Sequence, residues 1–273
     1  MAKLEVILSI FALSVSALTA QQELAGARAT RTVDGNLTVS SDESRPLRFA
    51  LLALAETYGW TVDYEDPVYS GSEISDTTDA QWLKEHPNGR HVYAPAKGSF
   101  SADLGKVVDG NPDEMQLVSA LTVLYDRTSN PGTFQVVRTA NGRLAVVGQS
   151  RHQPAGAFTP VLNQQMRPPQ KSESASKALQ ELASECSVAA GVPIELGILP
   201  SNATATSTVS GYDGMLTCRE QLGRILAALD HPTEYLLLYD INTRAYYLNI
   251  APARQLVVGP GGKLTTVPLD NRN

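Results

Sequence analysis

One helical spacing of leucines occurs twice in this chain, and it constrains the fold more than any other feature. In each occurrence the leucines line one face of a predicted helix, and a hairpin pattern follows. The matched positions are Leu117 and Leu222, Leu121 and Leu226, and Leu124 and Leu229. Because the same succession of patterns appears in both halves, we expect one α+β unit to be present in two copies.

The second copy, residues 172–250, has the clearer pattern. Thr217 is a good N-cap, and Glu220 three residues later completes the pattern of a capping box. The order of predicted elements is helix, strand, strand, helix and hairpin. Of these, the elements with assigned positions are a helix ending before Gly191, a strand over 192–196, a helix after Thr217, and strands over 235–239 and 245–250.

The first copy, residues 36–148, repeats this order with an insertion at 71–97. Asn141-Gly142 is a strong signal for a two-residue hairpin turn. The other predicted elements are a strand over 36–40, a helix from Pro46 to Gly59, strands over 60–64 and 100–108, a helix capped by Asn111, and hairpin strands over 134–138 and 144–147.

These patterns predict an α+β chain of two small βαβ-type domains. Each domain is expected to have two helices packed on short mixed or antiparallel sheets. Residues 149–171 are rich in Gln, Pro and Arg and are predicted to form a linker, within which 158–162 could add a strand to the second unit. Residues 251–273 are predicted to form a disordered tail.

Composition excludes one class of partner. Apolar residues make up 42% of the chain and charged residues 18%, which is typical of a globular protein, and the formal net charge is −6. Nucleic-acid binding requires a clustered basic surface that neutralises phosphates, and no such cluster is present. We therefore expect no nucleic-acid partner.

The first 20 residues resemble a secretory signal peptide. Lys3 precedes an apolar core over 6–15, and small residues follow at the expected cleavage position. The alternative is an uncleaved anchor, for which the apolar run is short. Cleavage would leave a periplasmic or secreted protein without a stable membrane span.

The two cysteines, Cys186 and Cys218, are predicted to be bridged if the chain enters an oxidising compartment. The bridge would close a loop of about 33 residues, worth roughly 3.5 kcal/mol in the chain-entropy treatment. The alternative is a pair of buried reduced thiols.

The second copy resembles the secretin and TonB short N-terminal (STN) domain, and the first copy resembles it more faintly. The segments that carry the resemblance are 178–182, 191–194, 209–214, 216–217 and 221–226, with 51–60, 115–121 and the turn at 141–142 in the first copy. The resemblance implies a small periplasmic module that docks other proteins ahead of a secretin ring or a receptor barrel. No segment after Ile250 is long enough for either, so docking is the role that we carry forward.

Few residues suggest chemistry. His86 and His91, with Asp79 and Glu85 nearby, could form a loose metal site, but their spacing is not that of a metal-binding helix or a structural zinc site. Asp63 and Glu65 alternate on a predicted strand, and we expect both to face water. The sequence therefore predicts no catalytic residue, cofactor or metal.

Two functions remain open. The first is a non-catalytic module that docks an envelope protein through the edges of its closing hairpins. The expected interaction residues are Tyr235, Tyr239, Tyr246 and Tyr247, since tyrosine is enriched at interfaces. The alternative is an envelope enzyme whose site is assembled around the insertion, with Trp82, His86 and His91.

Overall fold

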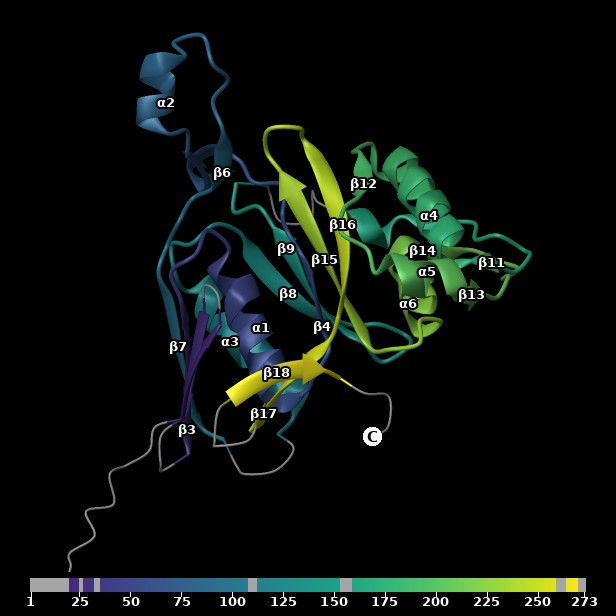
Figure 1. Ribbon diagram of the computed structural model, residues 1–273, viewed down its shortest axis with the longest axis horizontal. Coiled ribbons are helices and arrows are strands. Elements are labelled where there is room, and N and C mark those ends of the chain that lie inside the picture. The colour runs from purple at the N-terminus through teal and green to yellow at the C-terminus, as the bar shows by residue number, and fades with distance from the viewer. Residues whose placement is uncertain are drawn as a thin grey trace, which may run out of the picture.

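The computed structural model describes residues 20–24, 27–31, 35–107, 112–152, 159–258 and 264–269 (Figure 1). The prediction of an α+β fold is confirmed, with helices packed on small mixed and antiparallel sheets. The predicted signal peptide lies outside the described residues except for Ala20, where the first strand begins. Within the described ranges, no helix has the length and apolar character needed to cross a membrane.

The first half of the chain forms helices α1, α2 and α3 and strands β1 to β9. Helix α1 ends at Gly59, which adopts a positive φ of 68° that favours glycine. The elements are β1 (Ala20–Leu24), β2 (Ala27–Arg31), β3 (Asn36–Ser41), α1 (Pro46–Tyr58), β4 (Val62–Glu65), the 3₁₀ turn η1 (Gly71–Glu73), β5 (Ile74–Asp76), α2 (Ala80–Glu85), β6 (Tyr93–Pro95), β7 (Phe100–Lys106), α3 (Glu114–Asp126), β8 (Thr133–Arg138) and β9 (Leu144–Gln149).

The second half forms the remaining described elements. Its predicted capping box is confirmed: the Thr217 hydroxyl accepts from the Glu220 N–H, and the Glu220 carboxylate accepts from the Thr217 N–H. The elements are η2 (Val161–Asn163), β10 (Gln165–Met166), β11 (Glu173–Ser174), α4 (Ala175–Ala190), β12 (Ile194–Leu196), α5 (Ser201–Thr206), β13 (Thr208–Val209), β14 (Leu216–Thr217), α6 (Cys218–Ala227), β15 (Thr233–Asp240), β16 (Ala245–Pro252), β17 (Arg254–Val258) and β18 (Leu264–Pro268).

A six-stranded sheet in the order β12-β16-β15-β4-β9-β8 runs through both halves. The first half contributes β4, β9 and β8, and the second half contributes β12, β16 and β15. The halves meet where β15 pairs with β4 in parallel, over the short register Leu236 to Tyr64 and Leu237 to Glu65. The two predicted units therefore share one sheet.

The two faces of this sheet are covered by different helices, as Figure 1 shows. On one face, Val62, Tyr64 and Leu144 pack with α1 and α3, beyond which lies the four-stranded sheet β1-β2-β3-β7. On the other face, Tyr235 and Leu237 pack with α4 and α6. Each half thus has its own hydrophobic cluster.

Two segments differ from the expected linker and tail. Leu162 and Met166, within the predicted linker, are buried in the cluster of the second half. Residues 251–252 extend β16, and β17 and β18 form a hairpin that packs on α1. In the part of the chain that the structure describes, the segment predicted to be a disordered tail thus forms the paired strands β17 and β18, and the central residues of β17 are half-buried.

The start of α3 also differs from the prediction. Asp113 is the N-cap, and its side chain accepts from the Gln116 N–H at 3.0 Å. The predicted cap, Asn111, lies outside the described residues.

Candidate functional site

The hairpin of β15 and β16, predicted to form a sheet edge, lies inside the sheet. β16 pairs with β12 and β15 pairs with β4, so neither strand offers an edge. Tyr235, Tyr239 and Tyr246 are buried, whereas Tyr247 is half-buried. In this structure three of the four predicted interaction tyrosines are therefore core residues, and Tyr247 alone remains a candidate contact.

The carboxylates on β4 are also not where the sequence predicted them. Asp63, Glu65 and the following Asp66 are 0%, 2% and 2% exposed. Asp63 and Glu65 do share a face, as alternation requires, but the second half of the chain covers that face. The prediction that they face water is wrong, because alternation specifies which residues share a face and not what covers it.

Each of these three carboxylates pairs with an arginine. We call the β4–β15 strand pairing, together with Asp63, Glu65 and Asp66, the joint. The Arg143 guanidinium donates to Asp63 at 2.6 and 2.9 Å. The Arg219 guanidinium, on α6, donates to Glu65 at 2.7 and 2.8 Å. Burial raises the pKa of the Asp63 carboxyl, and the Arg143 charge opposes this shift.

Two of the carboxylates also extend the short strand pairing at its ends. Asp63 accepts from the backbone N–H of Tyr235 at 3.0 Å, and Asp66 accepts from that of Tyr239 at 3.0 Å. Arg45 donates from Nε to Asp66 at 2.7 Å. Since backbone and guanidinium donors occupy these oxygens, the joint is built to hold the two halves together rather than to transfer protons.

A groove opens beside the joint, on the sheet face that carries Tyr247. Its volume is about 270 Å³. The residues that shape it are Arg45, Tyr93, Pro95, Tyr239, Tyr247 and Asn249. It therefore lies between the β15–β16 hairpin and the insertion of the first half.

The insertion, residues 71–97, forms an arm that projects from the body of the molecule (Figure 1). Trp82, Val92 and Tyr93 on the arm are 40%, 51% and 41% exposed, and α2 buries none of its residues. The rings of Trp82 and His86 stack at 4.8 Å between centroids. The arm thus presents aromatic surface to solvent, and its Tyr93 also lines the groove.

The arm is fixed at its base by a buried carboxylate. Glu73 accepts from the backbone N–H groups of Gly132, Arg151 and Ser70 at 2.8, 3.0 and 3.1 Å, and from the Ser150 hydroxyl at 2.6 Å. Both of its oxygens are therefore satisfied by donors from the body and the base of the arm.

A second clasp holds the arm to the β15–β16 hairpin. The Asn242 side chain accepts from the Tyr93 N–H at 2.8 Å and donates to the Tyr93 carbonyl at 2.9 Å. In this way the amide pairs with β6 as a neighbouring strand would. The wall of the groove that contains Tyr93 is consequently held in one position.

Of the residues named for the alternative enzyme, all on this arm, Trp82 and His86 lie together, whereas His91 has a different partner. His91 pairs with Asp76 at 2.5 Å, whereas His86 stacks on Trp82. Hydrogen bonds from Thr78 and from His91 lower the pKa of the exposed Asp76 carboxyl to about 2. Asp79 caps α2 by accepting from the Trp82 N–H.

Glu85, the other carboxylate considered for a metal site, accepts from the Gln81 amide on the arm surface. Among the residues that the structure describes, no three His, Cys, Asp or Glu side chains are grouped as metal ligands would be.

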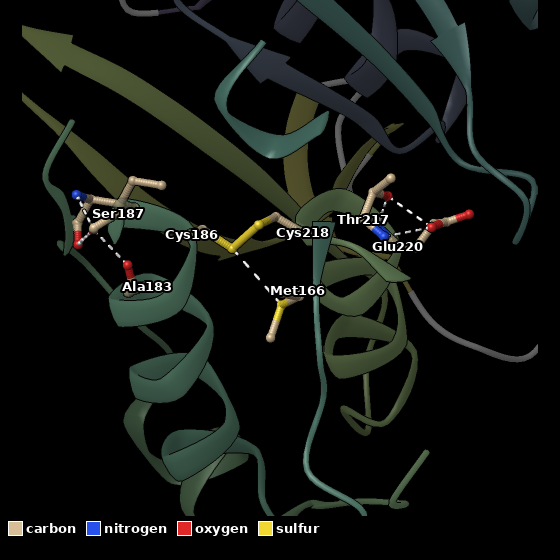
Figure 2. The surroundings of a disulfide bond; sticks show 8 residues. Met166, Ala183, Cys186, Ser187, Thr217, Cys218 and Glu220 are labelled. Atoms are coloured by element: carbon tan, nitrogen blue, oxygen red, sulfur yellow. Dashed lines mark hydrogen bonds between the residues drawn. A yellow bond between two sulfur atoms is a disulfide. The ribbon is translucent and has the colours of Figure 1, made fainter. Parts of the chain in front are cut away.

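The predicted disulfide between Cys186 and Cys218 is confirmed, with Cα atoms 6.2 Å apart. It links α4 to the first turn of α6, and both cysteines are fully buried (Figure 2). The Cys186 sulfur contacts the Met166 sulfur at 3.8 Å. The bond therefore lies in the core of the second half, away from solvent.

Comparison of the chain with protein-family models, with curated proteins and with solved structures gave no match. The functional assignment therefore rests on the sequence and on the geometry of the groove and arm.

Proposed function

We propose that this protein is a non-catalytic docking module that binds a partner polypeptide in the periplasm or outside the cell. The observation that carries the proposal is the aromatic arm: Asn242 fixes Tyr93 beside a groove that contains Tyr247, and Trp82 is exposed on the same arm. Exposed aromatic side chains on a fixed scaffold supply interface area at a low cost in conformational entropy. Docking is also the role that resemblance to the STN domain implies.

The compartment is supported by the disulfide. Disulfides persist in oxidising compartments and are rare where glutathione and thioredoxin keep thiols reduced. The buried Cys186–Cys218 bond, together with the signal-like first 20 residues, supports an extracytoplasmic location. The partner that we propose is accordingly an envelope protein.

The test is site-specific crosslinking in envelope extract, combined with affinity capture. A photo-crosslinker that replaces Tyr93 should join the protein to a partner, whereas the same crosslinker in place of Val188 should not. Val188 is a suitable control because it is exposed on α4, in the second half of the chain. The triple variant Trp82→Ala, Tyr93→Ala, Tyr247→Ala should lose the captured partner, and Val188→Ala should keep it.

The proposal fails if the triple variant is folded by circular dichroism and recovers the same proteins as wild type. It also fails if crosslinks form equally well from both positions, since contact would then not be specific to the arm.

A further inference from the structure

The six-stranded sheet consists of two equivalent blocks of three strands. β4 pairs with β9 in parallel and β9 with β8 in antiparallel orientation. β12 pairs with β16 in parallel and β16 with β15 in antiparallel orientation. β4 and β12 are therefore equivalent strands, and so are β8 and β15.

The joint pairs the outer strand of one block with the opposite outer strand of the other. It uses β15 of the second block and β4 of the first. The strands equivalent to these, β8 and β12, are the two outermost strands of the same sheet, and neither pairs with a further strand among the residues that the structure describes. A second copy of the chain could therefore repeat the joint by pairing its β8 with the β12 of the first copy. Such a contact is head-to-tail and does not close on itself, so it would propagate.

The registers identify the positions that would meet. Aligning the two hairpins on their matched pairs makes Phe134 equivalent to Tyr235 and Val136 equivalent to Leu237. Aligning β12 on β4 in the same way makes Ile198 equivalent to Asp66.

At the joint, the N–H of Tyr235 donates to Asp63 on the paired strand β4, whereas on the free edges the accepting side chains come from the same half of the chain as the edge strand. The N–H of Phe134 donates to Asp126 at 3.0 Å. The N–H of Ile194 on β12 donates to the Ser187 hydroxyl at 2.7 Å. Unpaired N–H and C=O groups on an edge are a template for another strand, so a side chain that bonds to them opposes such pairing.

Just after β12, a side chain likewise occupies a backbone N–H that an added strand would use. The N–H of Ile198 donates to the Asn249 side chain at 2.9 Å. At the joint, the equivalent N–H of Asp66 donates instead to the Leu237 carbonyl at 2.8 Å. The Ile198 N–H, which would donate to an added strand, therefore already donates to a side chain of the same copy.

We propose that β8 and β12 are a matched pair of surfaces for head-to-tail association with a second copy of this chain, and that Asp126, Ser187 and Asn249 keep these edges closed. Ser187 acts from α4, next to the edge strand (Figure 2). Removing these three side chains frees the N–H groups of Phe134, Ile194 and Ile198. The equivalents of two of them bond across the joint: the N–H of Asp66 donates to the Leu237 carbonyl, and that of Tyr235 donates to the Asp63 carboxylate.

The test is sedimentation velocity over a wide concentration range. Wild type is expected to stay monomeric. The variant Asp126→Ala, Ser187→Ala, Asn249→Ala is expected to associate, with its weight-average mass at least doubling at the highest concentration. Should this variant fail to fold, Ser187→Ala alone takes its place, with a smaller rise in mass.

Val136→Pro added to the opened variant is the matched control. Alternation along β8 places the Val136 N–H on the same outward side as that of Phe134, so proline removes one edge donor and leaves the β8–β9 bonds intact. This change should restore the monomer. A folded opened variant that stays monomeric, or one that associates equally well with Val136→Pro, overturns the proposal.

Discussion

Glu65 on β4 and Arg219 on α6 are 154 residues apart in sequence and share a buried, bidentate ion pair. The Tyr235 hydroxyl also donates to Glu65 at 2.6 Å. The pair connects strand β4 of the first half to helix α6 of the second half. It therefore ties the two predicted units together through their cores and not through a flexible linker.

We expect Arg219→Met to destabilise the protein by about 3–5 kcal/mol, because it leaves the Glu65 carboxylate buried without its cation. The double variant Glu65→Met, Arg219→Met should lose much less, since no charge is left buried. Urea unfolding at neutral pH measures both. Glu181→Gln, which removes only an exposed contact with Lys177, is the control and should leave the midpoint unchanged. Equal losses in the single and double variants would contradict this account.

Glu234 should make stability depend on pH near neutrality. Burial, together with the charges of Asp63 and Glu56, raises its pKa to about 7, although Arg48 and Arg143 oppose the shift. The folded protein therefore holds a proton that the unfolded chain releases, and the stabilisation from this group is lost as pH rises from about 4.5 to about 7.

The loss attributable to Glu234 is about 3 kcal/mol over that range. Glu234→Gln keeps a neutral side chain at every pH, so its stability curve should be flatter than that of wild type. Unfolding free energies measured at several pH values between 4 and 8 test this expectation. Parallel curves for the two proteins would show that Glu234 does not titrate in this interval.

Glu73→Gln should loosen the arm and destabilise the fold. The new amide would place its own N–H₂ group against backbone donors that now bind the carboxylate, and a buried donor left unsatisfied costs roughly 1–3 kcal/mol. Limited proteolysis should then cut within 71–97 faster than in wild type. Glu85→Gln, on the exposed surface of the same arm, is the matched control. Equal cleavage rates in the two variants would rule out Glu73 as the anchor.

Loss of the Cys186–Cys218 bond should destabilise the second half by about 2–4 kcal/mol. Cys186→Ala, Cys218→Ala is expected to unfold at a lower urea concentration than wild type. A reductant present during unfolding should lower the urea concentration at the midpoint for wild type, because unfolding exposes the buried bond. The same reductant should leave the midpoint of the variant unchanged. An unchanged midpoint in the variant would mean that packing around Met166 stabilises this region without the bond.

The local elements were predictable because their signals are local. The capping box of Thr217 and Glu220 and the glycine end of α1 at Gly59 each depend on residues within one or two turns. The disulfide was a single possible pairing between two cysteines in one predicted unit. The arm was recognised as an insertion, but its exposed aromatic surface and the groove beside it were not.

What the tertiary structure decided is which surfaces are covered. The sequence by itself determined that Asp63 and Glu65 share one face of a strand, because side chains alternate. Only the fold decided that Arg219 and Tyr235, more than 150 residues away, cover that face and bury both carboxylates. The same holds for Tyr246: the sequence predicted its strand, but the pairing of β16 with both β12 and β15 made it a core residue. The physical reason is that secondary structure follows from short-range patterns, whereas burial depends on long-range pairing that no local pattern specifies.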